Sequence, residues 1–356
     1  MNNVIKNISN ANAVSVLEKI TRTLLYEGYS LYPYYRSAIK NQKPIPFGVI
    51  FPKDYNAHNE HSHSHMQSQT IIHGNRELTV SVDVRFLHLR RTELFQKSSY
   101  NEEFSPVFEM EIEGKTYQAG SPTIERKIQN NLLKINDLIA TEKTIPFAFE
   151  SFNEGEMIFN AEKEIVGKKT TTISMITGVV KIEAVPLPEI DKSFRLTVTV
   201  TNTTPVANAE RRTRDEVLLQ SFLSTHIILQ THDAEFISHQ ETPAQWQAAM
   251  ATCNNVNTWP ILIDKNNSTL LSSPIILYDY PEINPVSSGD LFDSTEIEEA
   301  LLLHVNLLSD EEKKRIGGND EKLRAMLNKV GSLTPEDLIV YHSMMKDITP
   351  GGFDNK

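Results

Sequence analysis

The sequence predicts an α+β fold in which an antiparallel β-sandwich-like core lies between an N-terminal helix and a helical C-terminal part. Two observations predict it. Between residues 70 and 204, apolar and polar residues alternate in several short runs separated by turn residues, which favours antiparallel strands with one buried face. On either side of this region, apolar residues recur at intervals of three and four, the spacing of amphipathic helices.

The first expected element is an amphipathic helix over residues 12–26. Its apolar positions share one helical face: Val14, Leu17, Ile20 and Leu24. Gly28 suits the end of this helix, because glycine readily adopts the left-handed conformation found there. Prolines interrupt the aromatic residues between 29 and 52, so that stretch cannot form one regular element.

The central region is expected to contain a long strand, a hairpin, a helix and a further pair of strands. Residues 78–89 alternate apolar and polar side chains, as a half-buried strand does. Residues 108–117 carry a Glu-Gly pair between two apolar runs, which is typical of a hairpin. A helix is expected over 122–140, and strands over 173–184 and 194–201.

The remaining elements mix helices and strands. Residues 212–230 predict a helix, or a helix that runs into a short strand, and 243–253 predict a second helix. Residues 259–263 and 274–278 resemble buried strands, and the pattern is helical from Ser294 onward.

We therefore expect three regions along the chain. They are an N-terminal helix with an aromatic and histidine-rich loop segment (1–69), a β-rich core (70–206), and a part that passes from α/β to helical and packs on the core (207–356).

Composition excludes several classes of function. The chain has 356 residues, of which 39% are hydrophobic and 23% charged, as in an ordinary globular protein. Its 46 acidic and 35 basic residues give a net charge of -11, which would repel a polyphosphate backbone, so no nucleic-acid partner is expected. No apolar run has the length of a membrane span, and no cleavable leader pattern is present, so we expect a cytoplasmic location.

Catalytic signatures are missing from the sequence. It contains no glycine-rich phosphate-binding loop, no zinc-protease helix motif and no serine nucleophile elbow. Cys253, the single cysteine, excludes a disulfide within the chain and fits a reducing compartment. Its neighbours after an amphipathic run are typical of a packed small residue rather than of a nucleophile. Whether the protein is an enzyme is left open.

A cluster of histidines suggests a metal-binding alternative. Five of the eleven histidines fall between residues 58 and 73, and an extended chain would place His61, His63 and His65 on one side. Neutral imidazoles bind nickel, zinc or copper. The intervening Asn and Ser residues fit equally well with a polar loop that has no fixed coordination sphere. The sequence requires no cofactor, and a divalent metal stays an open alternative.

Two further segments carry candidate binding residues. The first is rich in tyrosine and contains Arg and Lys, a combination enriched at protein interfaces and also suited to core packing: Tyr26, Glu27, Tyr29, Tyr32, Tyr34, Arg36, Lys40 and Asn41. The second is acidic and fits a helix start near Ser294, a cation site or an electronegative docking surface: Asp279, Tyr280, Asp290, Asp293 and Glu296.

The same two segments resemble an uncharacterised bacterial family. The matching stretches are Tyr26-Glu-Gly-Tyr-Ser-Leu-Tyr-Pro-Tyr-Tyr-Arg-Ser-Ala-Ile-Lys-Asn41, Ser273-Pro-Ile-Ile-Leu-Tyr-Asp-Tyr-Pro281 and Gly289-Asp-Leu-Phe-Asp-Ser-Thr-Glu-Ile297, and the resemblance spans about residues 24–316. We associate the family with gene clusters of uptake nickel–iron hydrogenases. The resemblance implies no activity or catalytic residue. The chain departs from the family's pattern at residues 42–45, and its histidine cluster is peculiar to it.

These observations favour a non-catalytic accessory or assembly factor that acts by protein–protein contact, and the resemblance points to hydrogenase-related maturation. The two candidate segments would line one surface. A metal-dependent enzyme or metal-delivery protein using Asp279, Asp290, Asp293 and the histidines is a second hypothesis. A small-ligand binding module at the end of the sheet is a third.

Overall fold

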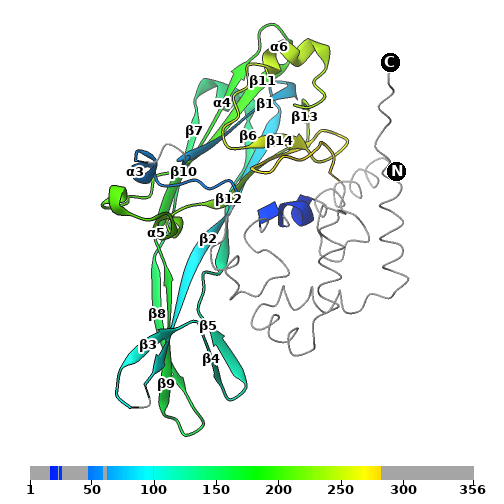
Figure 1. Cartoon of the computed structure of the whole chain (residues 1–356). Helices are drawn as coiled ribbons and strands as arrows, with labels where there is room; N and C mark the ends of the chain where they lie inside the picture. The colour runs from blue at the N-terminus through cyan, green and yellow to red at the C-terminus, as the bar shows by residue number, and fades with distance from the viewer. Residues whose placement is uncertain (1–16, 23, 26–46, 59–61, 99, 282–356) are drawn as a thin grey trace, which may run out of the picture.

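The computed structural model describes residues 17–22, 24–25, 47–58, 62–98 and 100–281. Its main body is a sandwich of two antiparallel sheets (Figure 1). The five-stranded sheet has the order β13 (Ala234–Phe236), β1 (His65–Gly74), β11 (Ser193–Asn202), β10 (Ile176–Pro186) and β7 (Lys143–Phe149). The predicted α+β class with a β-sandwich core is thereby confirmed.

The eight-stranded sheet is built around one long strand, β2 (Thr79–Lys97). Its main path runs β14 (Trp259–Leu262), β15 (Thr269–Ser273), β12 (Leu223–Thr231), β2, β9 (Ile165–Ile173) and β8 (Phe152–Phe159). Two further strands, β3 (Phe104–Val107) and β6 (Thr123–Lys134), also pair with β2. Strands from the second and third predicted regions thus share one sheet, and β1 begins before residue 70.

The main hydrophobic core lies between the two sheets. Alternate residues of β2, such as Val82 and Phe86, pack against side chains of the other sheet, such as Ile182 and Val198. This is the packing that the alternation of residues 78–89 predicts, since successive strand residues point to opposite faces. Each fully buried Val, Ile or Phe contributes roughly 1.5–3 kcal/mol relative to an exposed position.

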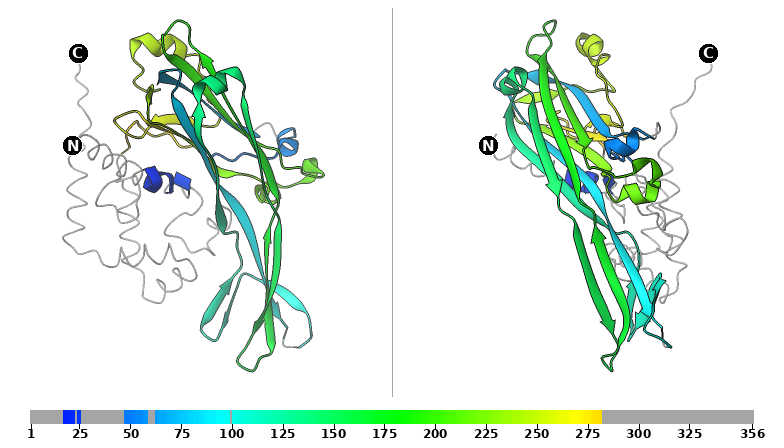
Figure 2. Two further views of the ribbon diagram at one scale, coloured as in Figure 1. Left: turned by 180° about the vertical axis from the view of Figure 1, so that it is seen from behind. Right: turned by 90° about the vertical axis from the view of Figure 1, so that its left-hand side faces the viewer.

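An arm projects from one end of the sandwich (Figures 1 and 2). It comprises residues 90–97 of β2 together with β3, β8, β9 and the hairpin of β4 (Glu109–Ile112) and β5 (Lys115–Gln118). The strands β7 and β10 pair in the sandwich, and their continuations β8 and β9 pair in the arm, so this strand pair passes from one sheet to the other at residues 150–151 and 174–175.

The arm has a small apolar core of its own. Leu94, Met110 and Ile158 are buried together where the β4–β5 hairpin folds over the sheet. The hairpin turn matches the prediction, because Glu113 and Gly114 both have positive φ, at 53° and 75°, as a tight two-residue hairpin turn requires.

Short helices cover the outer face and edges of the sandwich. Residues 17–22 and 24–25 are helical, and Leu17, Ile20 and Leu24 pack on Ile228 and Leu271. The other short helical elements are α3 (Lys53–Asn56), α4 (Ile135–Ala140), η1 (Ala209–Arg211), α5 (Arg214–Leu218), η2 (Ala244–Trp246) and α6 (Gln247–Met250). Within the described residues, none of the helices is long and apolar enough to cross a bilayer.

Two expected elements are corrected by the structure. The helix expected over 122–140 is wrong for most of its length, because residues 123–134 form β6 along β2 and only α4 is helical. The strand expected over 274–278 is also wrong, since β15 ends at Ser273 and the side chains of Ile276 and Tyr278 are 69% and 87% exposed.

Other expectations are confirmed. Residues 212–230 follow the helix-then-strand alternative, with α5 starting in a capping box between Thr213 and Glu216 before β12. Within the helix expected over 243–253, residues 244–250 are helical, in η2 and α6. The helical tail expected from Ser294 lies outside the described residues.

Candidate functional site: the β arm

Most of the binding residues singled out in the sequence lie outside the described residues: Tyr26, Glu27, Tyr29, Tyr32, Tyr34, Arg36, Lys40, Asn41, Asp290, Asp293 and Glu296. Whether the two candidate segments share a surface stays a prediction. Asp279 and Tyr280 are described, and both make contacts within the sandwich.

Asp279 fastens the chain after β15 to two neighbouring segments. Its carboxylate accepts hydrogen bonds from the Ser238 hydroxyl at 2.6 Å and from the Leu262 backbone N–H at 2.8 Å. The Tyr280 hydroxyl donates to Asn267 Oδ1 at 2.8 Å, and Lys265 Nζ lies 4.1 Å from the centre of its ring. These contacts give both side chains a structural role within the sandwich.

The predicted metal ligands are spread along the start of β1. His61 lies outside the described residues, His63 is exposed, and His65 is the first residue of β1. Burial lowers the pKa of His65, with smaller contributions from the charges of His63 and Lys53. Across the described part of the chain, no group of three or more His, Cys, Asp or Glu side chains is placed to hold a metal ion.

A buried Ser–His pair is structural. His226 Nδ1 lies 2.7 Å from the Ser224 carbonyl oxygen and Nε2 lies 3.3 Å from Ser273 Oγ, which fits donation from Nδ1 to the carbonyl. Both His226 and Ser273 are fully buried, so no substrate reaches them. Burial also raises the pKa of the Cys253 thiol, which favours the unreactive protonated form.

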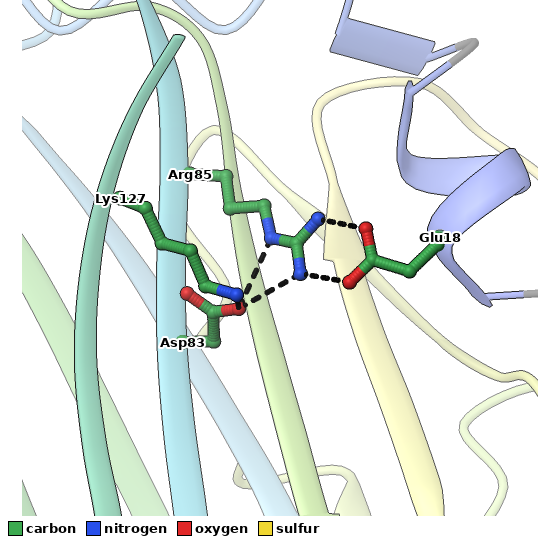
Figure 3. A network of polar contacts seen from close by, with 4 residues as sticks. All are labelled: Glu18, Asp83, Arg85 and Lys127. Atoms are coloured by element: carbon green, nitrogen blue, oxygen red, sulfur yellow. Dashed lines mark hydrogen bonds and ion pairs between the residues drawn. The ribbon is translucent and has the colours of Figure 1, made fainter. Parts of the chain in front are cut away.

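A charged network on the outer face of β2 joins the N-terminal helix to the sheet (Figure 3). Arg85 donates to both carboxylate oxygens of Glu18 at 2.6 Å and to Asp83 Oδ2 at 3.0 Å. Lys127 Nζ lies 3.0 Å from the same Asp83 oxygen. Each charge in this network has an opposite partner, so attachment of the N-terminal helix to the sheet is sufficient to account for these four residues.

The arm, in contrast, exposes apolar side chains. Phe104 is 37% and Met157 is 44% exposed, and Phe108, Phe152, Phe159 and Ile165 are also exposed. Apolar surface held away from the protein's own core is typical of an interaction site. Strand β8 lies at the edge of its sheet, so one side of its backbone has no strand partner within the described residues.

Strand register places several of these side chains in one row. Pro106 is opposite Phe95, Phe95 is opposite Lys168, and Lys168 is opposite Met157, so the row crosses β3, β2, β9 and β8. Phe104 lies one pair further along, opposite Lys97. We call Phe95, Phe104, Pro106, Met157 and Lys168 the outer arm face.

The outer arm face lies opposite the β4–β5 hairpin. A Cβ atom at Gly167 would come within 2.6 Å of Met110 Cε, so Gly167 faces the hairpin, and the adjacent Lys168 must face the other way. Met110 and Ile158 fill the hairpin side. Within the described residues, no element of the chain packs on the outer arm face.

One basic side chain stands at the centre of the row. Lys168 stands between Phe95 and Met157 and makes no ion pair with any described residue, whereas Lys169 on the hairpin side pairs with Glu156 at 3.5 Å. A lysine flanked by apolar side chains suits a partner surface that is apolar with a carboxylate.

Sequence reasoning did not identify the outer arm face. Its five residues come from four separate strands and are united only by register, which the sequence does not reveal. The available signal was the aromatic and methionine content of residues 152–159 beside glutamates, which is unusual for an exposed strand.

Comparison with known proteins identifies no relative of this chain. No protein-family model, no curated protein and no solved structure matches the chain.

Proposed function

We propose that the protein is a non-catalytic accessory or assembly factor that binds a protein partner through the outer arm face. The observation that carries the proposal is a row on the projecting arm in which Pro106 and Met157 are exposed and Phe95 and Lys168 are half-buried. A projecting arm can contact a partner even where the surface of the sandwich does not complement that partner.

The chemistry of the face defines the partner. Phe and Met side chains favour an apolar patch, since aromatic residues and Met are enriched in interface cores. Lys168 favours a carboxylate near the centre of that patch. The sequence resemblance to a family associated with uptake nickel–iron hydrogenases directs the search first to proteins of hydrogenase maturation.

Site-specific photocrosslinking tests the proposal. A photoreactive phenylalanine analogue would replace Met157 in one protein and Val185 in another, expressed in the native host. Both side chains are 44% exposed on β-strands, but Val185 lies in β10 of the sandwich. We expect one discrete crosslinked partner from position 157 and none from 185. Equal crosslinking from both positions, or none from 157, would refute the proposal.

Charge reversal then tests the role of Lys168 with the partner that crosslinking identifies. Lys168→Glu places a carboxylate opposite the partner's carboxylate, so we expect at least a tenfold rise in Kd. Lys163→Glu, in the turn between β8 and β9, is the matched control and should change Kd less than twofold. An unchanged Kd for Lys168→Glu would show that the partner does not contact this face.

A further inference from the structure

Three basic side chains lie on one side of the sheet where the sandwich passes into the arm. His88 and Arg90 lie two residues apart on the core-facing side of β2, and Arg126 of β6 pairs with Phe86 on that same side. Arg126 Nη2 lies 3.5 Å from His88 Nδ1, and the guanidinium carbon lies 4.4 Å from the centre of the Phe149 ring. The cluster therefore caps the open end of the aromatic core.

The cations of this cluster have no anionic partner among the described residues. Neither Arg90 nor Arg126 forms an ion pair with a described carboxylate, and the Nε atoms of both are buried without a hydrogen-bond acceptor. Arg85, on the opposite face of the same strand, has two carboxylates. Both arginines are half-buried, and partial desolvation of a cation is costly when no anion offsets it.

The histidine does not offset this charge. Burial first, and then the charge of Arg126, lower the pKa of His88 to about 4, while the nearby Leu219 and Ser174 carbonyls act in the other direction. His88 is thus neutral at pH 7. Since a guanidinium group can only donate, His88 Nδ1 is the acceptor in its contact with Arg126.

We infer that this junction binds a small oxyanion of the carboxylate or phosphate type, held by the guanidinium groups of Arg126 and Arg90. Guanidinium forks match the paired oxygens of such anions. The two positive charges without carboxylate partners supply the attraction, and Phe149 fixes the plane of Arg126. This site is separate from the outer arm face, so either proposal can fail alone.

Thermal unfolding of the whole chain in the presence of anions tests the inference. Inorganic phosphate and succinate would be titrated separately, with sodium chloride added to hold the ionic strength constant. We expect a saturable rise in Tm on the order of 5 °C when the better anion is at one hundred times its Kd. The anion that saturates at the lower concentration identifies the ligand type.

Variants separate a specific site from a general salt effect. Arg126→Met and Arg90→Gln should each weaken binding of the better anion at least tenfold. Arg91→Gln, which removes a cation from the opposite face of β2, should leave the Tm shift unchanged. Without anion, Arg126→Met should keep or raise the Tm, because it removes an uncompensated charge.

The inference is overturned if neither anion gives a saturable shift, or if the shift survives in Arg126→Met and Arg90→Gln. A clear fall in the Tm of Arg126→Met without anion would assign Arg126 to structure through its contact with Phe149. If one variant does not fold, calorimetric titration of the other with the same anion decides the question.

Discussion

Arg85 holds Glu18 by two hydrogen bonds of 2.6 Å, one to each carboxylate oxygen, and so fastens the N-terminal helix to the middle of β2 (Figure 3). The helix buries Leu17, Ile20 and Leu24 on the outer face of the sheet. Apolar packing supplies most of the attachment, and the ion pair adds orientation, because a bidentate guanidinium–carboxylate pair permits one geometry.

Glu18→Gln should destabilise the protein by about 1 kcal/mol or less at pH 7, since the carboxylate is half exposed. The hydrogen bonds from Arg85 lower the pKa of Glu18, so the carboxylate form is favoured in the folded state. Its contribution is fully present above about pH 4.3 and is lost as the pH falls through the lowered pKa. Urea unfolding at pH 7 and pH 3 measures this. Glu93→Gln, exposed on the same strand, is the control, and an equal loss at both pH values would contradict the prediction.

Gly178→Ala should destabilise the protein by about 1–3 kcal/mol. Gly178 is directly opposite Phe147 in the β7–β10 pair, and an added Cβ would overlap the Phe147 ring within the aromatic cluster around Phe86. Gly155→Ala in β8 is the control, because the nearest atom to an added Cβ there is Lys168 Cε at 3.8 Å. Chemical denaturation of both variants measures the difference. Equal stability of the two would show that Phe147 can move aside.

Stability should fall between pH 6.5 and pH 4 because buried histidines must take up protons on unfolding. Burial lowers the pKa of His226 to about 4, with Arg85 adding to the effect and the Ser224 carbonyl opposing it. Burial also lowers the pKa of His239 to about 4. The unfolded chain, with histidine pKa values near 6.5, binds more protons in this window, so the stability present above pH 6.5 is lost on acidification.

His226→Gln should reduce this pH dependence by on the order of 3 kcal/mol across the window. The measurement is the free energy of unfolding at pH 7.5, 6.5, 5.5 and 4.5. His63→Gln, at an exposed position, should leave the slope as it is in the unmodified protein. An unchanged slope in His226→Gln would mean that this histidine does not control the acid response.

The sandwich was predictable because its strands have one buried face. Residues 78–89 show it, as the alternating apolar side chains all lie in the core. The same strand continues to Lys97, but residues 90–97 include four charged side chains, and Leu94 is followed directly by Phe95, so the alternation is lost in the arm. In the expected helix over 122–140, Ile124 and Ile128 are four residues apart, which fits a helix as well as a strand, and only the pairing with β2 shows that residues 123–134 form a strand.

The candidate sites were less predictable than the fold. Arg126 and His88 are 38 residues apart and meet only because β6 pairs with β2 in one register. A shift of one residue would turn Arg126 to the solvent face. Side-chain chemistry was visible in the sequence, but the pairing that brings these side chains together was not.

Asn202→Ala should destabilise the protein by about 2–4 kcal/mol, because a fully buried amide joins three backbone groups. Asn202 Nδ2 donates to the carbonyl oxygens of Ile50 and Gln220 at 3.0 and 2.8 Å, and Oδ1 accepts from the Thr204 N–H at 3.0 Å. Truncation leaves the Gln220 carbonyl and the Thr204 N–H without this partner, whereas the Ile50 carbonyl keeps its hydrogen bond from the Phe222 N–H. Urea unfolding measures the loss, and Asn153→Ala on exposed β8 should change stability by less than about 0.5 kcal/mol. A loss below about 1 kcal/mol for Asn202→Ala would mean that water replaces the amide, and the end of β11 would then not depend on this residue.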